Sequence, residues 1–536
     1  MSLQSSISTL ALAACAGVPA FSQTCTPTAI TPYTSIDGSW TTTDSVVVSA
    51  GKQVTLGPHP ISGGAWNWSG CGTGGTGREQ TFAVSATCTA TATFINSCGA
   101  KTQQLFTLSV PMVTRDLSVQ EGLVAVLIRP SLSLAAGRSA SWSLAGTDAA
   151  RFTIDSATGA LAFRQVPNAA SPGDADGHND YEVTLQVSDG LRSAQAPVTV
   201  RVLPWNQGGA AGFPLPPATR EVARPAGNSG QPGLRVLAWA GFKAAVSYTF
   251  DDAQPSQIDH YPELKAQRVR ATYYINTAST GYPGFDATWI DAVGQGSEIG
   301  NHTTHHCRAA ELTDNNASSC PAGLASAGAE FDDTSNYIRT KIGQAAVWTA
   351  AYPFGDTDYR AAAASRFFIG RGVPKGMVAP GTGSDALNLP IIGFSGGDSL
   401  AAFNNAVDNA LSQGRWMIYL FHSLLPTTQN WFAGEDIGAV TGNVAYAKSF
   451  GTVWLDSVVN IGAYWRGQQL LQAAVPNVSG GMTTWQWTLP ANFPPGRKLR
   501  VVVDGGNLWQ NGAALAWDRR GYYEVSLDAQ SLRWTP

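Results

Sequence analysis

The pattern of apolar and polar positions divides the chain into β-rich regions at both ends and a middle region where strands alternate with helices. Residues 25–111 and 112–204 hold short apolar runs separated by Gly-rich turns, which indicates two all-β regions. In the second region Val183, Leu185 and Val187 alternate with polar residues, so we expect them on one buried face of a strand. Both regions are predicted to be β-sandwich domains.

Two further segments surround the middle of the chain. Residues 205–235 are rich in Pro and Gly and show almost no periodicity, which predicts a linker. Residues 471–536 return to strand-like runs and are predicted to form a small C-terminal β domain. That domain either contacts a substrate or only covers the neighbouring region.

Between residues 236 and 470, apolar runs typical of buried strands alternate with segments of helical length. Strands are predicted at residues 244–250, 270–275, 298–300, 416–421 and 453–455, and helices at residues 255–267 and 286–293. Repeated strand–helix units favour a parallel (β/α) barrel, which collects its catalytic groups at the carboxyl ends of its strands.

Composition narrows the class of protein. At 536 residues the chain is too long for one hydrophobic core, so three or four domains are expected. Its 33 Lys and Arg against 37 Asp and Glu give a net charge of −4, which argues against a nucleic-acid partner. The 17 Trp residues suit stacking on sugar rings, although Trp also fills cores.

The N-terminus predicts export. An apolar stretch at residues 7–20 is too short for a membrane span and suits a signal peptide over residues 1–20, cleaved after Ala20. Residues 12–15 also resemble a bacterial lipobox, so the alternative is a lipid anchor at Cys15. No other segment is long and apolar enough to cross a bilayer. The prediction is a secreted protein, or one lipid-anchored to the cell envelope.

The cysteines agree with an oxidising compartment. Loss of Cys15 leaves six of the seven cysteines, an even number suited to disulfides. Four of them lie within residues 25–111 and allow three pairings. The other two, Cys307 and Cys320, can staple one loop of the middle region.

Acids and imidazoles follow three of the predicted barrel strands. Asp251 and Asp252 close the first strand, and His422 follows a late one. His302 and His306 are four residues apart, which on a helical turn would bring both imidazoles to one ion. Two His with one carboxylate leave coordination positions open, as in catalytic metal sites, so Asp252 is the expected third ligand and Asp251 a free base.

Each of these features also has a structural explanation. Paired Asp residues after a strand often cap a helix, a His-rich run can be adventitious, and the motif around His422 can be a packed strand end. His305 is expected to be such an adventitious residue, pointing away from its neighbours. The joint occurrence of all three elements in one barrel favours the functional interpretation.

These elements resemble the motifs of carbohydrate esterase family 4, the NodB-homology polysaccharide deacetylases, over residues 236–470. The resemblance implies a distorted (β/α) barrel (NodB-type) and metal-dependent removal of acetyl groups. It implies Asp251 as general base, His422 as general acid, and Asp252, His302 and His306 as ligands of a divalent metal, usually zinc. Residues 352–355 resemble the third motif, which makes the Phe354 N–H the oxyanion donor.

The chain departs from that family pattern at two places. The third motif usually carries an Arg that orients the base, and here that position is Ala351; Arg371 or Lys375 is the candidate substitute. The fourth motif, usually an Asp and a Trp near the acetyl pocket, is matched only by Asp398. The assignments of Asp251 and of the three metal ligands do not depend on these positions.

The two N-terminal regions carry resemblances of their own. Residues 25–111 resemble immunoglobulin-like modules of carbohydrate-active enzymes, where Trp40, Trp66 and Trp68 either bind sugar or fill the core. Residues 112–204 resemble a cadherin repeat. For that repeat a calcium site is one interpretation and a solvated polar loop the other, with the candidate oxygen ligands Asp174, Asp176, Asn179 and Asp180.

The resemblance leaves the substrate open. Chitin, its oligomers or another N-acetylglucosamine polymer is the preferred expectation, because Trp-bearing accessory modules suit an insoluble polymer. The alternative within the family is an acetylxylan esterase. The alternative from another class is a carbohydrate-binding surface protein with a degenerate barrel, which the missing Arg at Ala351 favours and the intact acids and imidazoles oppose.

Overall fold

The computed structural model describes residues 25–205, 214–219, 221–227, 232–313, 320–321, 323–381 and 383–536. The predicted signal peptide, its cleavage site and Cys15 lie outside these residues, as do parts of the predicted linker. The described chain forms two compact units. One holds the residues up to Pro111 with 132–139 and 189–194, and the other holds 112–131, 140–188 and 195–536. Among the described residues no helix combines the length and apolar character needed to cross a membrane.

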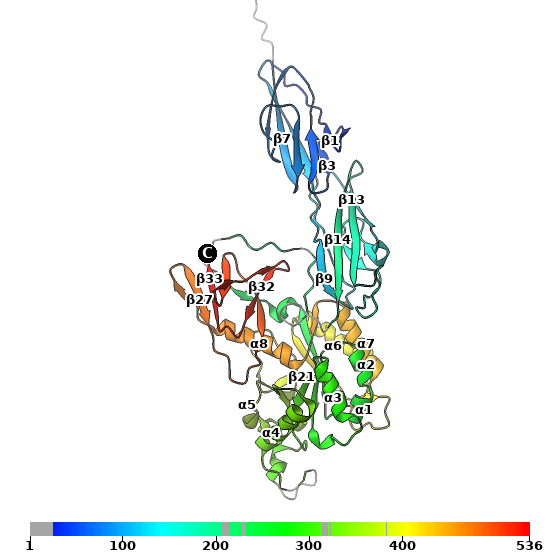
Figure 1. Ribbon diagram of the computed structural model, residues 1–536, viewed down its shortest axis with the longest axis vertical. Coiled ribbons are helices and arrows are strands. Elements are labelled where there is room, and N and C mark those ends of the chain that lie inside the picture. The colour runs from blue at the N-terminus through cyan, green and yellow to red at the C-terminus, as the bar shows by residue number, and fades with distance from the viewer. Residues whose placement is uncertain are drawn as a thin grey trace, which may run out of the picture. The chain divides into compact units, whose positions relative to one another are not determined.

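The first unit is a pair of four-stranded sheets that share one core (Figure 1). The sheet orders are β2-β1-β4-β6 and β3-β8-β7-β5. The strands are β1 Thr34–Ile36, β2 Ser39–Thr41, β3 Ser45–Val47, β4 Lys52–Leu56, β5 Gly64–Ser69, β6 Gln80–Val84, β7 Cys88–Asn96 and β8 Lys101–Ser109. Disulfides Cys25–Cys98 and Cys71–Cys88 select one of the three pairings that the sequence allows.

The tryptophans of this unit divide between core and surface. Trp66 and Trp68 are each 5% exposed and pack with Phe94 and Phe106 between the sheets. Trp40 is 48% exposed. The first two therefore fill the core, and of the three only Trp40 presents its ring to solvent.

The second β region opens the other unit. Its main sheet has the order β10-β13-β14-β9, with β9 parallel to β14, and a separate pair joins β11 to β12. The strands are β9 Asp116–Gln120, β10 Ser141–Ala145, β11 Phe152–Ile154, β12 Leu161–Phe163, β13 Asp180–Ser188 and β14 Ser193–Leu203. Val183, Leu185 and Val187 are all buried, which confirms the shared face that their alternation predicts.

Seven parallel strands close into a barrel in the middle of the chain. The ladder runs β17-β18-β19-β20-β21-β22-β16, and a further pairing of β16 with β17 completes the ring, while β25 adds to the start of β16. The strands are β16 Ala244–Asp251, β17 Thr272–Ile275, β18 Glu298–Asn301, β19 Thr349–Ala351, β20 Ile369–Lys375, β21 Leu389–Gly393, β22 Trp416–Phe421 and β25 Val453–Leu455. The predicted (β/α) barrel is confirmed.

Helices cover the outside of this barrel (Figure 1). They are α1 Pro255–Asp259, α2 Tyr261–Ala266, α3 Phe285–Gly294, α4 Ala327–Tyr337, α5 Arg360–Ala364, α6 Leu400–Gln413, α7 Ile437–Ser449 and α8 Val458–Ala473. The single helix predicted for residues 255–267 is two helices that meet at His260. Pro262 explains the break, because it has no N–H to continue the helical ladder.

Alternation along β16 separates the barrel's inside from its outside. Val246, Tyr248 and Phe250 pack outward into the core shared with the helices. Ser247 and Thr249 face the other way and are fully buried. Asp251 continues this inward series, so the strand's own pleat aims its carboxylate into the barrel.

The C-terminal region contributes two sheets, β15-β28-β32-β31 and β26-β27-β33-β29-β30. Their strands are β15 Arg235–Val236, β26 Asn477–Ser479, β27 Met482–Gln486, β28 Lys498–Val502, β29 Asn507–Gln510, β30 Ala513–Ala514, β31 Trp517–Asp518, β32 Tyr522–Ser526 and β33 Ser531–Thr535. Strand β15 ends the predicted linker segment and pairs here rather than in the barrel. Gly467 of α8 lies so close to Leu527 that an added Cβ would approach it to 2.4 Å, so helix and sheet share one core.

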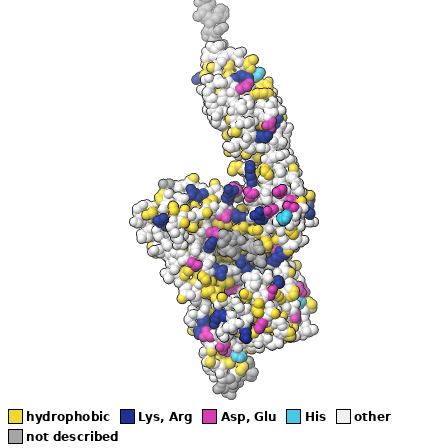
Figure 2. All heavy atoms as spheres, viewed as in Figure 1, with side chains coloured by type: hydrophobic (Ala, Val, Ile, Leu, Met, Phe, Trp, Pro, Cys, Tyr) yellow, Lys and Arg dark blue, Asp and Glu magenta, His cyan; other side chains and the backbone are white. Residues whose placement is uncertain are grey.

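Charge is spread thinly over the molecule. On the face shown in Figure 2, Lys and Arg side chains are interspersed with Asp and Glu. This distribution agrees with the nearly balanced composition.

A buried carboxylate ties α8 to the barrel and generates a stability prediction. Glu298 is 4% exposed and accepts hydrogen bonds from the Thr349 hydroxyl (2.6 Å), the Thr272 hydroxyl (2.9 Å) and the Val459 N–H (2.9 Å). Its burial raises its pKa. The N–H of Val459 lies in the first turn of α8, where a carboxylate also suits the helix dipole.

We expect Glu298→Ala to cost about 3 kcal/mol, because it leaves three buried donors without an acceptor. The barrel transition in calorimetry should fall by about 6–12 °C. Glu298→Gln keeps the shape and one acceptor oxygen, so its loss should be clearly smaller. Equal melting temperatures for the Ala variant and the wild type would contradict this role of Glu298.

Candidate metal centre and active site

Strand register brings the two Asp residues and His422 to the same end of the barrel. Phe250 of β16 pairs with Phe421 of β22, so the residues that follow, Asp251 and His422, end neighbouring strands. The chain then turns sharply, with left-handed backbone at Asp252 (φ 73°) and Ala253 (φ 51°). This turn lets Asp252 reach the cleft that Asp251 already faces.

His302 and His306 lie on an irregular loop after β18, and the helical turn suggested by their four-residue spacing does not form. Thr303 (φ 64°) and His306 (φ 56°) are left-handed, which no α-helix permits. Local side chains hold this backbone instead. The Asn301 Oδ1 accepts the Thr303 N–H (2.9 Å), and the Thr303 hydroxyl accepts the His306 N–H (3.1 Å).

His305 turns to a different partner, as the sequence predicts. Its Nδ1 lies 2.9 Å from Glu330 Oε1, and the other carboxylate oxygen accepts the backbone N–H groups of Thr304 and His305. Glu330 is 3% exposed and fixes the far side of the loop. The His305 ring therefore contacts Glu330 rather than the candidate ligands His302 and His306.

Asp252, His302 and His306 converge on one point. Asp252 Oδ1 lies 3.3 Å from the Nε2 of His302 and 3.3 Å from the Nε2 of His306. The three candidate ligand atoms all lie within 4.8 Å of one another. Among the described residues this is the one set of three His, Cys, Asp or Glu side chains with such spacing.

The chemistry of this donor set fits a divalent cation. His302 Nδ1 lies 2.9 Å from the Ala351 carbonyl, which fixes the ring so that Nε2 presents its lone pair to the centre. Asp252 Oδ1 is buried and accepts no hydrogen bond from any described residue. One carboxylate and two imidazole acceptors facing a common point are satisfied together by a cation.

The local field keeps Asp252 ionised. Burial alone would raise its pKa, but contact with His302, whose own pKa the neighbouring carboxylates raise, holds the pKa of Asp252 well below its usual range. Burial and the nearby His302 lower the pKa of His306 to about 4, which leaves that imidazole neutral near pH 7. A neutral imidazole and a charged carboxylate are the forms that bind metals.

Arg371 supplies the cation missing at Ala351. These two residues are register partners on strands β19 and β20. The Arg371 guanidinium is 1% exposed and forms a buried ion pair with Asp251 Oδ2. Lys375, the other candidate, lies on the exposed end of the same strand. The other oxygen of Asp251, Oδ1, is buried and accepts no hydrogen bond from the described residues.

His422 lies across the centre from the loop. Its Nε2 is 4.0 Å from Asp252 Oδ2. Burial, opposed by the two Asp charges, lowers the pKa of His422. The Phe432 ring meets the imidazole edge-on with 4.8 Å between centroids, so one side of His422 is shielded from water.

A cleft of about 760 Å³ opens over these groups. Its wall carries three exposed aromatic side chains, Phe354 (53%), Trp431 (54%) and Phe432 (62%). The N–H groups of Trp431 and Phe432 both donate to the buried Ser423 hydroxyl, at 3.1 and 3.4 Å, which anchors their loop. These two residues were not among the predicted site residues. The pattern that could have indicated them is a pair of adjacent aromatic residues in a polar loop soon after His422.

Two other predicted residues are placed differently. Phe354 lies in the cleft with left-handed backbone (φ 56°), a strained conformation for a residue with a side chain. Its ring centroid is 4.6 Å from that of His306. Asp398 does not line the cleft; it sits in a turn, where its carboxylate accepts the Ser395 N–H. The structure gives no support to Asp398 as part of an acetyl pocket.

Fold and site together define a closed parallel barrel with a candidate metal centre at its strand ends. Residues 241–368 match the family model described as polysaccharide deacetylase. The matched region contains Asp251, Asp252, His302, His306 and Phe354, and it covers less than half of the chain. This region of the chain is thus similar to polysaccharide deacetylases. None of the curated proteins matches the sequence.

Several solved structures are similar to part of this chain at low sequence identity. The Xyl-CE4 domain of a multidomain xylanase from the hindgut metagenome of Trinervitermes trinervoides is 16% identical (TM-score 0.29), with 44% of this chain and 95% of that chain covered. A putative polysaccharide deacetylase from Mycobacterium smegmatis is 12% identical (TM-score 0.33; 48% and 98% covered). A family 4 carbohydrate esterase from Streptomyces lividans is 16% identical (TM-score 0.26; 41% and 95% covered).

The geometry predicts which histidines bind metal. We expect His302→Ala to weaken binding of Zn²⁺ by more than about 100-fold, because loss of even a ligand's hydrogen-bond partner commonly costs 10–100-fold. His305→Ala is the matched control and should bind Zn²⁺ as the wild type does. Titration calorimetry on metal-stripped protein measures both. Equal weakening in the two variants would show that the conformation of the loop, rather than the His302 imidazole, determines the affinity for Zn²⁺.

Proposed function

We propose that this chain is a secreted, metal-dependent polysaccharide deacetylase that removes acetyl groups from N-acetylglucosamine-containing polymers such as chitin or its oligomers. One observation carries the proposal. Three acceptor atoms of Asp252, His302 and His306 converge on a point beside Asp251, whose Oδ1 is buried and unpaired among the described residues. The match of residues 241–368 to polysaccharide deacetylases supports a hydrolase acting on acetyl groups.

The ligand set favours zinc. Two imidazoles and one carboxylate are donors typical of catalytic zinc, whereas calcium and magnesium prefer oxygen ligands alone. With three protein ligands, a tetrahedral ion retains a position for water or substrate. A zinc ion held there would polarise the acetyl carbonyl and lower the pKa of a neighbouring water.

The protein groups divide the remaining chemistry. Asp251, oriented by Arg371, accepts the proton of the attacking water at its free Oδ1. The Phe354 N–H donates to the oxyanion of the tetrahedral intermediate. His422 then protonates the departing amine. Because burial lowers the pKa of His422, its protonated form transfers the proton readily.

The exposed aromatic wall suits a glycan. Trp431 and Phe432 present ring surface at the cleft mouth, and aromatic rings pack well against the apolar faces of sugars. Their loop is anchored at Ser423 rather than free, so the rings are positioned before substrate arrives. The three disulfides suit a protein that works outside the cell.

The second β region supports a calcium site as an accessory feature. Asp174 is 8% exposed, and its Oδ1 is buried without a hydrogen-bond partner among the described residues, as is the Oδ1 of Asn179. Asp174 and Asp176 both accept the His178 N–H, and their carboxylate oxygens suit an oxygen-preferring cation. The fourth predicted ligand, Asp180, instead pairs with Arg201. Calcium should raise the unfolding temperature of the wild type but not of Asp174→Asn, which thermal unfolding with and without calcium measures.

Two other functions remain to be separated by experiment. An acetylxylan esterase would use the same centre on an ester, and the Xyl-CE4 domain is a solved structure with a similar fold. A carbohydrate-binding protein with a degenerate barrel needs no metal and no base. The buried pair of Arg371 with Asp251 weighs against degeneration, since it replaces the cation that Ala351 lacks.

Acetate release tests the proposal directly. The wild type should release acetate from chitin oligomers faster than from acetylxylan, and removal of metal should stop both reactions. Asp251→Asn should lower turnover about 100- to 10,000-fold, as expected for loss of a general base, while Zn²⁺ binding persists. Asp333→Asn, on an exposed face of α4, is the control. Near-native turnover in Asp251→Asn would remove the base assignment.

The Arg371–Asp251 pair predicts a rescue. Arg371→Ala should lower kcat about 100-fold with little change in KM, because the base loses its orientation. Its removal also leaves a buried charge unpaired and should lower stability. The double variant Arg371→Ala/Ala351→Arg restores a cation from the register-paired position. It should recover part of the lost kcat and part of the lost stability. If the double variant recovers stability but not kcat, orientation of Asp251 is not the role of Arg371.

A further inference from the structure

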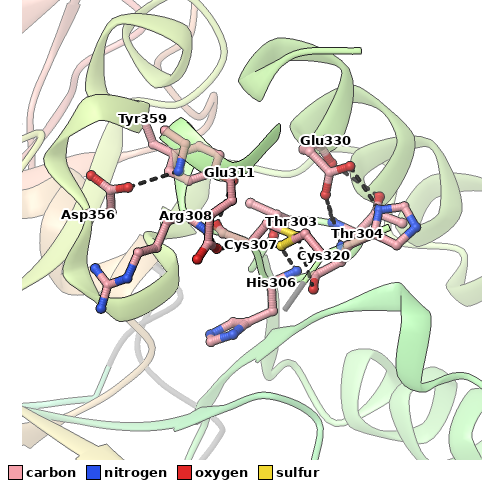
Figure 3. Close-up of a disulfide and its surroundings, with 12 residues drawn as sticks. Thr303, Thr304, His306, Cys307, Arg308, Glu311, Cys320, Glu330, Asp356 and Tyr359 are labelled. Atoms are coloured by element: carbon pink, nitrogen blue, oxygen red, sulfur yellow. Dashed lines mark hydrogen bonds and ion pairs between the residues drawn. A yellow bond between two sulfur atoms is a disulfide. The ribbon is translucent and has the colours of Figure 1, made fainter. Parts of the chain in front are cut away.

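Arg308 stands at the mouth of the cleft, two residues beyond His306. Its guanidinium carbon lies 4.5 Å from the centre of the Phe354 ring, and that ring lies 4.6 Å from the ring of His306. Figure 3 shows the Arg308 and His306 side chains leaving their loop away from the disulfide. The guanidinium is therefore one aromatic ring removed from the candidate metal ligands.

The other charges of the cleft are already engaged. Arg371 pairs with Asp251, and Asp252 faces the two imidazoles. The Arg308 side chain lines the same cleft and is exposed, yet it forms no ion pair or hydrogen bond with any residue that the structure describes. The contact with the Phe354 ring occupies no N–H group of the guanidinium with an acceptor, so these groups stay free to donate.

The loop around Arg308 is fixed in place (Figure 3). The disulfide Cys307–Cys320 holds the preceding residue, whose carbonyl accepts the Tyr359 hydroxyl at 2.8 Å. The Arg308 N–H donates to Glu311 (2.8 Å). The next N–H, of Ala309, donates to Asp356 (2.9 Å). A side chain on such a support is preorganised for a ligand.

We propose that Arg308 is a specificity-determining residue that binds a carboxylate of the substrate chain, next to the sugar that loses its acetyl group. A planar guanidinium with free edges matches a carboxylate, which it can bind through two parallel hydrogen bonds. The inference rests on the proposed deacetylase function and adds to it a preference for glycans that carry a carboxylate next to the acetylated sugar. Such a carboxylate belongs either to a lactyl ether, as in peptidoglycan glycan strands, or to a uronic acid branch, as in acidic xylans.

Matched substrate pairs test this inference. Soluble peptidoglycan glycan fragments and acetylated glucuronoxylan oligomers are each compared with the same material after conversion of its carboxylates to methyl amides. Acetate release gives kcat/KM for each form. The wild type should prefer the acidic form of at least one pair by about three- to fivefold, the upper part of the range for one exposed ion pair.

Variants assign the preference to the residue. Arg308→Gln should abolish the ratio between acidic and amidated forms, chiefly through KM, and Arg308→Lys should keep part of it. Arg339→Gln removes an exposed charge outside the cleft and should keep the wild-type ratio. High salt should shrink the ratio in the wild type but not in Arg308→Gln.

The outcomes distinguish failure of the role proposed for Arg308 from failure of the proposed deacetylase function. A preference confined to the glycan fragments identifies the lactyl source, and one confined to the xylan identifies the uronic acid source. Equal rates on acidic and amidated forms, or a preference that survives in Arg308→Gln, overturn the role of Arg308 while acetate release from chitin oligomers upholds the deacetylase. No acetate from any substrate overturns the proposed function as well.

Discussion

Closure of the barrel through β16 is the constraint on which the site depends. This strand pairs with β22 along most of its length and with β17 at its carboxyl end. The first pairing sets Asp251 beside His422, and the ladder from β17 to β18 brings the His302 loop to the same rim. Residues more than a hundred positions apart are thus neighbours because parallel strands end together. A slip of one residue in β16 would turn Asp251 out of the barrel.

The rim then carries backbone that a relaxed chain avoids. Asp252, Ala253, Thr303, His306 and Phe354 all have positive φ without being glycine. Each such residue costs roughly 1–3 kcal/mol and persists only where its surroundings over-determine it. In the loop after β18, hydrogen bonds accepted by Asn301, Thr303 and Glu330 from the loop's N–H groups provide that determination. Strain gathers where two imidazoles and two carboxylates have to face one point, which regular helix or strand geometry does not provide.

Much of this arrangement could be predicted from the sequence. Apolar runs such as residues 416–421 are enough to predict buried strands. Because these strands alternate with helices along the chain, a parallel barrel is the simplest arrangement. The loop at residues 302–306 could not be predicted, because a four-residue spacing fits a helical turn and a left-handed loop equally well. Trp66 and Trp68 illustrate a related limit, since burial of an aromatic ring depends on the facing sheet rather than on its own neighbours in sequence. The contribution of Trp431 and Phe432 depends on how their loop folds back onto the buried Ser423 hydroxyl, which their sequence does not specify.

Arg371 shows how the need for a cation beside Asp251 can be met without the usual motif residue, since the motif position here is Ala351. A buried carboxylate such as that of Asp251, the proposed base, needs a cation beside it, and residues on more than one strand can supply that cation. Ala351 and Arg371 are partners across the β19–β20 ladder, where neighbouring strands lie about 4.8 Å apart, well within the reach of an Arg side chain. A cation can therefore move sideways by one strand and still meet Asp251 Oδ2. In a closed parallel barrel, residues paired across neighbouring strands lie at the same height around the barrel. A residue missing from a motif on one strand can therefore be replaced by its register partner on the next strand, and such partners should be examined before a site is judged degenerate.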